Sequence, residues 1–162
     1  MGTSHAARLQ KSLAEVRKEL VDTVKDISDE EFGWAPREGM KSYRALLQEI
    51  GTMEKLCDSW LTTGNILPWD MPAYVNGDSA GTALADLESI RSGSSAILAK
   101  ATEEQLQTPV GVPEDWQQYW GAEIEPEEAV RWIVLHEYYH LGQIISYRWI
   151  QGHDPYKGYT GN

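Results

Sequence analysis

The chain has 162 residues, of which 41% are hydrophobic, so we expect one packed domain over residues 1–162. Fourteen basic against 25 acidic residues give a net charge of −11, which excludes nucleic acid and anionic membrane surfaces as partners. The single cysteine, Cys57, excludes a disulfide framework and fits a reducing compartment. No apolar run approaches the roughly 20 residues of a bilayer span, and no signal-peptide pattern is present, so we predict a cytoplasmic protein.

Two segments in the first half of the chain have helical periodicity. Between residues 9 and 27, leucine, valine and isoleucine recur at spacings of three and four. The second segment opens at Ser42, a good N-cap residue, and ends at Gly64. Two amphipathic helices are therefore predicted here.

Two further helices are predicted in the second half. One runs from about Thr82 to Ile97, although its Ser/Gly stretch at 92–95 is a weak helix former. The last begins at Pro126, a favoured first-turn residue, and ends at Gly152.

The segments between these helices contain proline and glycine and show no sustained strand alternation. We therefore predict an all-α four-helix bundle with long loops between helices two and three and between helices three and four. The second of these loops has room for a short hairpin or helical turn near 112–124. Capping boxes are expected at Ser28 with Glu31 and at Thr102 with Gln105.

The last predicted helix contains His136-Glu137-Tyr-Tyr-His140, which matches the metalloprotease motif H-E-x-x-H. His136 and His140 are one turn apart on the inward face, so both imidazoles can reach one metal ion. The alternative is a pair of core histidines satisfied by hydrogen bonds. A zincin-like protease is a minor hypothesis, because we find no sheet before the motif helix and only His153 and Asp154 follow it as candidate ligands.

A third ligand is therefore sought across the bundle. Glu49 lies on or beside the apolar stripe of the second helix, between Leu46 and Met53, where an unpaired carboxylate is costly to bury. A cation would remove that cost. The alternative is a border glutamate that turns outward or pairs with a nearby arginine.

Several segments together resemble the DinB/YfiT-like superfamily. They are residues 27–36 (ISDEEFGWAP), 42–47 (SYRALL), Glu54 and, most specific, 136–144 (HEYYHLGQI). The resemblance implies an up-down-down-up four-helix bundle, a divalent metal held by one side chain of the second helix and two of the fourth, and a homodimer. Relatives of this kind include thiol-dependent S-transferases and a thiol-dependent isomerase.

The chain departs from the family pattern at position 49. The family usually has histidine there, five residues before the glutamate that is here Glu54, whereas this chain has Glu49. Glu49, His136 and His140 are therefore the predicted metal ligands. Such a set binds zinc or nickel and also suits Fe(II) or Mn(II). The alternative is a member that has lost its metal.

The function implied is that of a metal-dependent enzyme acting on a small molecule, as a hydrolase or as an S-transferase with a low-molecular-weight thiol. A non-catalytic bundle that binds a ligand or partner is the alternative. Glu137 is a candidate general base, although it lies about 100° round the helix from His136 and could face solvent or a loop. Gln143 and Tyr147 lie near the histidine face, where core hydrogen bonding is their simplest role. Cys57 is interpreted as a small core residue.

Overall fold

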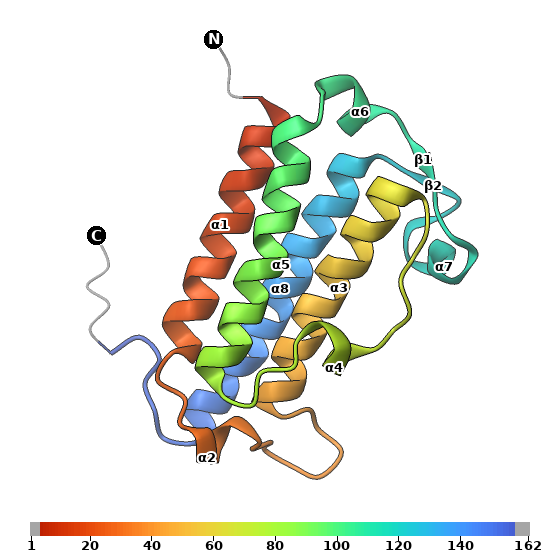
Figure 1. Ribbon diagram of the computed structural model, residues 1–162. Coiled ribbons are helices and arrows are strands. Elements are labelled where there is room, and N and C mark those ends of the chain that lie inside the picture. The colour runs from red at the N-terminus through yellow and green to blue at the C-terminus, as the bar shows by residue number, and fades with distance from the viewer. Residues whose placement is uncertain (1–3, 158–162) are drawn as a thin grey trace.

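Four long helices packed side by side form the body of the protein, whose computed structural model describes residues 4–157 (Figure 1). In Figure 1, the first and last of them descend whereas the two middle ones ascend, which is the up-down-down-up path. The prediction of an all-α four-helix bundle is therefore confirmed. The ends of the predicted domain, 1–3 and 158–162, lie outside the described residues. The helices are α1 (His5–Val24), α3 (Tyr43–Thr63), α5 (Ala80–Lys100) and α8 (Pro126–Ile150).

The connections between these helices carry short elements. In the connection before α8, two short strands pair antiparallel, with Val110 opposite Ile124, so a hairpin and helical turns both form near 112–124. No helix within residues 4–157 combines the length and the apolar character of a membrane span. The short elements are α2 (Asp29–Phe32), α4 (Met71–Tyr74), α6 (Glu103–Gln107), β1 (Val110–Gly111), η1 (Glu114–Trp116), α7 (Gln117–Trp120) and β2 (Glu123–Ile124).

The helix ends follow the local sequence signals. Ser42 caps α3, and Gly64 ends it in the left-handed conformation that glycine adopts without strain. Ser79 caps α5, so this helix begins at Ala80, two residues before the predicted start. Helix α5 continues without a break through its Ser/Gly stretch. Both expected capping boxes, at the starts of α2 and α6, are formed.

The apolar interior consists of two clusters at opposite ends of the bundle. One lies beside α2 and includes Phe32, Leu87 and Ile144. The other lies toward α6 and includes Leu13 and Trp60. On each long helix, the residues of the two clusters are separated by a buried charged side chain.

These four side chains form a charged layer made of Arg17, Glu54, Arg91 and Glu137, one from each long helix. Arg17 Nε donates to Glu137 Oε1 at 2.7 Å, and Arg17 Nη2 donates to Glu54 Oε2 at 3.0 Å. Arg91 Nε donates to Glu54 Oε1 at 2.6 Å, and Arg91 Nη2 contacts Glu137 Oε2. Two positive and two negative charges therefore balance inside the bundle.

The remaining donors of the charged layer are also satisfied. Arg17 Nη1 donates to the carbonyl of Leu87 at 2.7 Å, and Arg91 Nη1 donates to the carbonyl of Leu13. Burial by itself raises the pKa of Glu54, but hydrogen bonds from Arg91 and the charges of both arginines outweigh it, so that pKa is lowered. Glu54 is therefore ionised at neutral pH.

We expect Arg91→Met to reduce the free energy of unfolding by about 3–5 kcal/mol, because it leaves an uncompensated carboxylate in the interior. Urea denaturation measures this loss. The exposed Arg37→Met is the matched control and should change stability by less than about 0.5 kcal/mol. Arg91→Met combined with Glu137→Gln restores the charge balance and should cost less than Arg91→Met alone. Equal losses for the single and double variants would contradict the electrostatic explanation.

Candidate metal centre

Two histidines of α8 direct their ring nitrogens at one another. His136 and His140 are one helical turn apart, and their Nε2 atoms are 3.1 Å apart. His140 is buried and His136 is partly buried. This arrangement brings two potential metal donors to one point on the α8 surface.

Glu49 of α3 faces the same point. Its Oε2 atom lies 3.6 Å from His140 Nε2, and one ligand atom from each of the three residues lies within 4.8 Å of the others. The structure therefore brings together the three residues that sequence analysis selected from two helices. The same carboxylate oxygen contacts Nζ of Lys41, from the segment that precedes α3. Glu49 is thus paired with a cation here, although that cation is a lysine and not the arginine of the sequence-based alternative.

Gln143 fixes the orientation of His140. Its Oε1 atom lies 2.8 Å from His140 Nδ1, and its Nε2 donates to the hydroxyl of Tyr139 at 3.2 Å. In this arrangement Nδ1 of His140 carries the proton, which leaves a lone pair on Nε2. A hydrogen bond of this kind to the distal nitrogen is typical of histidines that bind metals. Gln143 therefore has a more specific role than core hydrogen bonding.

Both imidazoles favour the neutral state. Burial, reinforced by the neighbouring charge of His140, lowers the pKa of His136 from 6.5 to about 4. Burial also lowers the pKa of His140, against the opposing hydrogen bond from Gln143 and the charge of Glu49. Neutral imidazole is the form that binds metal ions, so two donors are available at neutral pH.

A run of aromatic rings leads to this group of residues. The ring of Trp132 stacks on His136 at a centroid distance of 5.2 Å and an interplanar angle of 16°. Trp120 of α7 packs edge-on against Trp132 at 5.3 Å and stacks on Trp60 of α3 at 5.4 Å. The connection before α8 is thereby tied to the histidine face. The register of a loop against a helix leaves no periodic signal, so the sequence does not place these rings next to His136.

A cavity of about 420 Å³ opens beside the three predicted ligands. Its walls combine apolar surface with the Lys41 ammonium group and the Tyr139 hydroxyl. A small molecule could therefore reach the ligand atoms from this side. The other lining residues are Met40, Leu46, Gln143 and Tyr147.

Family membership follows from comparison with known proteins. A sequence profile of the DinB superfamily matches residues 12–144. This chain belongs to the DinB superfamily. Among solved structures, it is similar to YfiT from Bacillus subtilis, described as a probable metal-dependent hydrolase with an unusual four-helix bundle topology. The two share 19% identity with a TM-score of 0.72, over 92% of this chain and 89% of YfiT. No curated protein matches significantly.

Glu137, the candidate general base, lies neither beside the metal ligands nor at a surface facing solvent or a loop. In this DinB protein it lies in the charged layer, almost fully buried, and is bonded to Arg17 and Arg91. It therefore faces neither solvent nor a loop, and it does not line the cavity beside the histidines. The physical reason is the 100° step between adjacent helical residues, which turns Glu137 toward α1 and α5. The motif's glutamate here acts as a partner of arginines.

The two other histidines, Cys57 and Tyr147 also have defined surroundings. His5 contacts Glu127 through Nδ1, and His153 Nε2 lies 2.9 Å from Glu31, so neither belongs to the Glu49 group. Cys57 is buried in the apolar cluster near α6, and burial raises the pKa of its thiol well above the usual range. Tyr147 packs against Trp34 and Tyr43.

We expect an NMR titration of the metal-free protein to show His136 gaining its proton near pH 4. Because the unfolded chain binds this proton near pH 6.5, the contribution of His136 to stability is complete above pH 6.5. That contribution is lost progressively as the pH falls toward 4. The His136→Asn variant assigns the resonance. An inflection at or above pH 6.5 would contradict the desolvated environment described here.

Proposed function

We propose that this protein is a metal-dependent enzyme whose single divalent ion is held by Glu49, His136 and His140. The observation that carries the proposal is the convergence of two neutral imidazoles and one carboxylate within 4.8 Å. A proton on His136 Nε2 lets the two rings hydrogen-bond to each other, whereas with neither Nε2 atom protonated both lone pairs can bind an ion between them. The donor set suits zinc or nickel, and also Fe(II) or Mn(II).

The chain's own side chains would prepare such a site. Gln143 holds His140 in the tautomer that presents Nε2, and Trp132 restricts the ring of His136 by stacking. Lys41 contacts Oε2 of Glu49, so its ammonium group lies beside the ligand group at the edge of the cavity. An ammonium group and the Tyr139 hydroxyl there suit a substrate with an anionic group.

For the reaction we propose hydrolysis, with thiol-dependent S-transfer as the second candidate. Similarity to YfiT, a probable metal-dependent hydrolase, supports the first. A metal ion with open positions lowers the pKa of a water molecule or a thiol and so supplies a nucleophile at neutral pH. Lys41 and Tyr139 would hold the substrate beside it. A low-molecular-weight thiol is the proposed cosubstrate of the second reaction.

Two other functions are less well supported. A protease of the zincin type needs the motif's glutamate beside the metal, and Glu137 is bonded to two arginines instead. A non-catalytic, metal-free bundle is favoured by one observation, the pairing of Lys41 with Glu49. Metal content of protein purified without a nickel column separates this alternative from the proposal.

The ligand set predicts a graded response in calorimetric titration of zinc and nickel into the apo protein. His136→Ala and His140→Ala should abolish tight binding, because each removes a neutral donor. Glu49→Leu should also lose it, whereas Glu49→His should retain or strengthen it. His153→Ala is the matched control and should bind like the wild type. The assignment is wrong if the wild type binds none of zinc, nickel, Fe(II) or Mn(II), or if Glu49→Leu binds as tightly as the wild type.

Activity is tested with metal-free and reconstituted protein on a panel of activated esters and amides, with and without added thiol. Turnover that requires both metal and His140 supports an enzyme, and dependence on thiol separates the two reactions. Stoichiometric metal binding without turnover on any member of the panel would favour a structural metal.

We also propose that the protein forms a homodimer through the outer face of α8. This face carries exposed apolar side chains at helical spacing, with small residues between them that allow close approach of a second helix. The stripe includes Leu135 (65% exposed), Tyr139, Gly142, Ser146 and Trp149. Because Tyr139 also lines the metal-site cavity, a partner chain would lie close to that cavity.

Light scattering should give twice the chain mass of 18.3 kDa for the wild type at micromolar concentration. Leu135→Arg should shift the protein to the monomer, because it places a charge in the apolar stripe. Tyr119→Arg, at a similarly exposed aromatic residue of α7, should leave the dimer intact. A monomeric wild type would contradict the proposal.

A further inference from the structure

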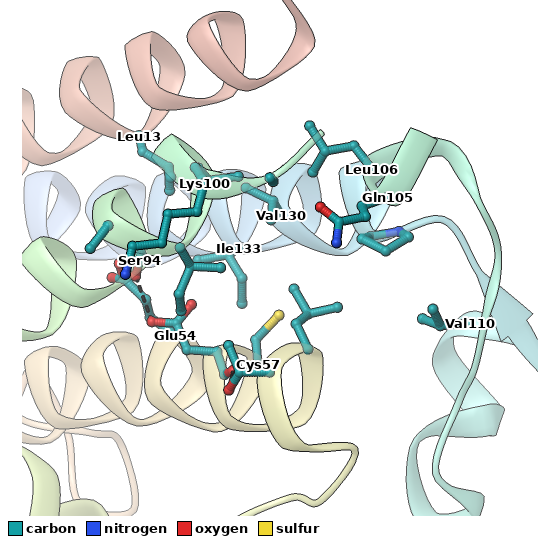
Figure 2. A pocket seen from close by; sticks show the side chains of 18 of the residues that line it. Leu13, Glu54, Cys57, Ser94, Lys100, Gln105, Leu106, Val110, Val130 and Ile133 are labelled. Atoms are coloured by element: carbon teal, nitrogen blue, oxygen red, sulfur yellow. Dashed lines mark hydrogen bonds between the residues drawn. The ribbon is translucent and has the colours of Figure 1, made fainter. Parts of the chain in front are cut away.

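A second cavity lies inside the other half of the bundle. It has a volume of about 710 Å³, opens between α3, α5, α6 and α8, and shares no lining residue with the cavity at the metal ligands (Figure 2). Its walls are mainly apolar. They include Leu13, Leu61, Ile97, Leu106, Val130 and Ile133.

One wall carries the carboxyl group of Asp58. Its protonation state is inferred from the number of protons available for two hydrogen bonds at Ser94. The Oγ atom of Ser94 lies 2.6 Å from Glu54 Oε1 and 2.7 Å from Asp58 Oδ2. A hydroxyl has one proton to donate, and Glu54 is held ionised by the arginines of the charged layer. Both short contacts are hydrogen bonds only if Ser94 donates to Glu54 and a protonated Asp58 donates to Ser94. Burial, with the negative charge of Glu54, raises the pKa of Asp58 to about 7, which agrees with this count.

Asp58 is influenced by the charges of Lys55 and Arg91 but is not held in an ion pair with either. Among residues 4–157 its carboxyl group forms no ion pair, and Ser94 is its one side-chain hydrogen-bonding partner. Lys100 also lines the cavity, yet it forms no ion pair with Asp58. An acid that forms no ion pair, on the wall of a mainly apolar cavity, is complementary to a ligand that brings a cation.

We propose that this cavity binds an amphipathic amine, whose ammonium group pairs with Asp58 while its apolar body lies along the walls between α3, α5 and α8. On binding, Asp58 releases its acidic proton to water, and the ammonium group, which has three protons to donate, takes the place of that proton between Asp58 and Ser94. Ser94 keeps its hydrogen bond to Glu54, so the charged layer is undisturbed. The site is independent of the metal centre.

Calorimetry with n-octylamine and n-octanol tests the proposal, because the two probes have the same alkyl chain. At pH 8 we expect the wild type to bind the amine at least tenfold more tightly than the alcohol. Asp58→Asn should remove this preference and leave the affinity for the alcohol within about twofold, since the amide can still donate to Ser94. Asp26→Asn, at an exposed position, controls for attraction of amines to the net charge of −11 and should behave like the wild type.

A cavity-filling variant tests the location. Ala101→Trp should abolish binding of both probes while far-UV circular dichroism and the cooperativity of melting stay unchanged. The proposal is overturned if the wild type binds neither probe at millimolar concentration or binds both equally. It is also overturned if Asp58→Asn keeps the preference for the amine, or if Ala101→Trp still binds while folded.

Discussion

The buried charged layer constrains the rest of the structure. Each long helix contributes one charge, and the layer separates two apolar clusters that would otherwise merge into one. Apolar packing alone tolerates sliding of one helix past another, but a shift of one turn would leave a guanidinium group or a carboxylate unpaired. Because such a shift leaves buried charges unpaired, the layer favours one axial register of the four helices.

The relative positions of the metal ligands follow from this axial register of the helices. Glu137 is adjacent to His136 in sequence, and Glu54 follows Glu49 by five residues on α3. Once Glu54 and Glu137 are both fixed on the same two arginines, the rotation and height of α3 and α8 are fixed as well. Glu49 is thereby brought to the side of α3 that faces the two histidines, where Lys41 also contacts it. The way in which α3 packs beside α8 thus places both the two acids of the charged layer and the three residues of the ligand group.

Sequence analysis predicted the ligand group because its signals are local. Two histidines four residues apart share a helix face in any helix, and Glu49 is identified by its place on an apolar stripe together with the family pattern. The surroundings of Glu137 were not predictable in this way. Its partners Arg17 and Arg91 lie 120 and 46 residues away, and a helical wheel gives an angle but not the neighbouring helix. Ser94, which looked like a weak point of α5, is hydrogen-bonded to Glu54. The pairing of Lys41 with Glu49 likewise depends on how a loop folds back.

The aromatic run at His136 has an optical consequence. Trp132 lies against the ring of His136, and Trp120, Trp116 and Trp60 continue the run at centroid distances of 5.0 to 6.0 Å. Excitation energy passes readily between indoles this close. Light absorbed by one ring of the run can therefore be emitted from Trp132, the ring nearest the histidines. The fluorescence of these four of the seven tryptophans is therefore expected to respond to events at His136 and to the packing of the connection before α8.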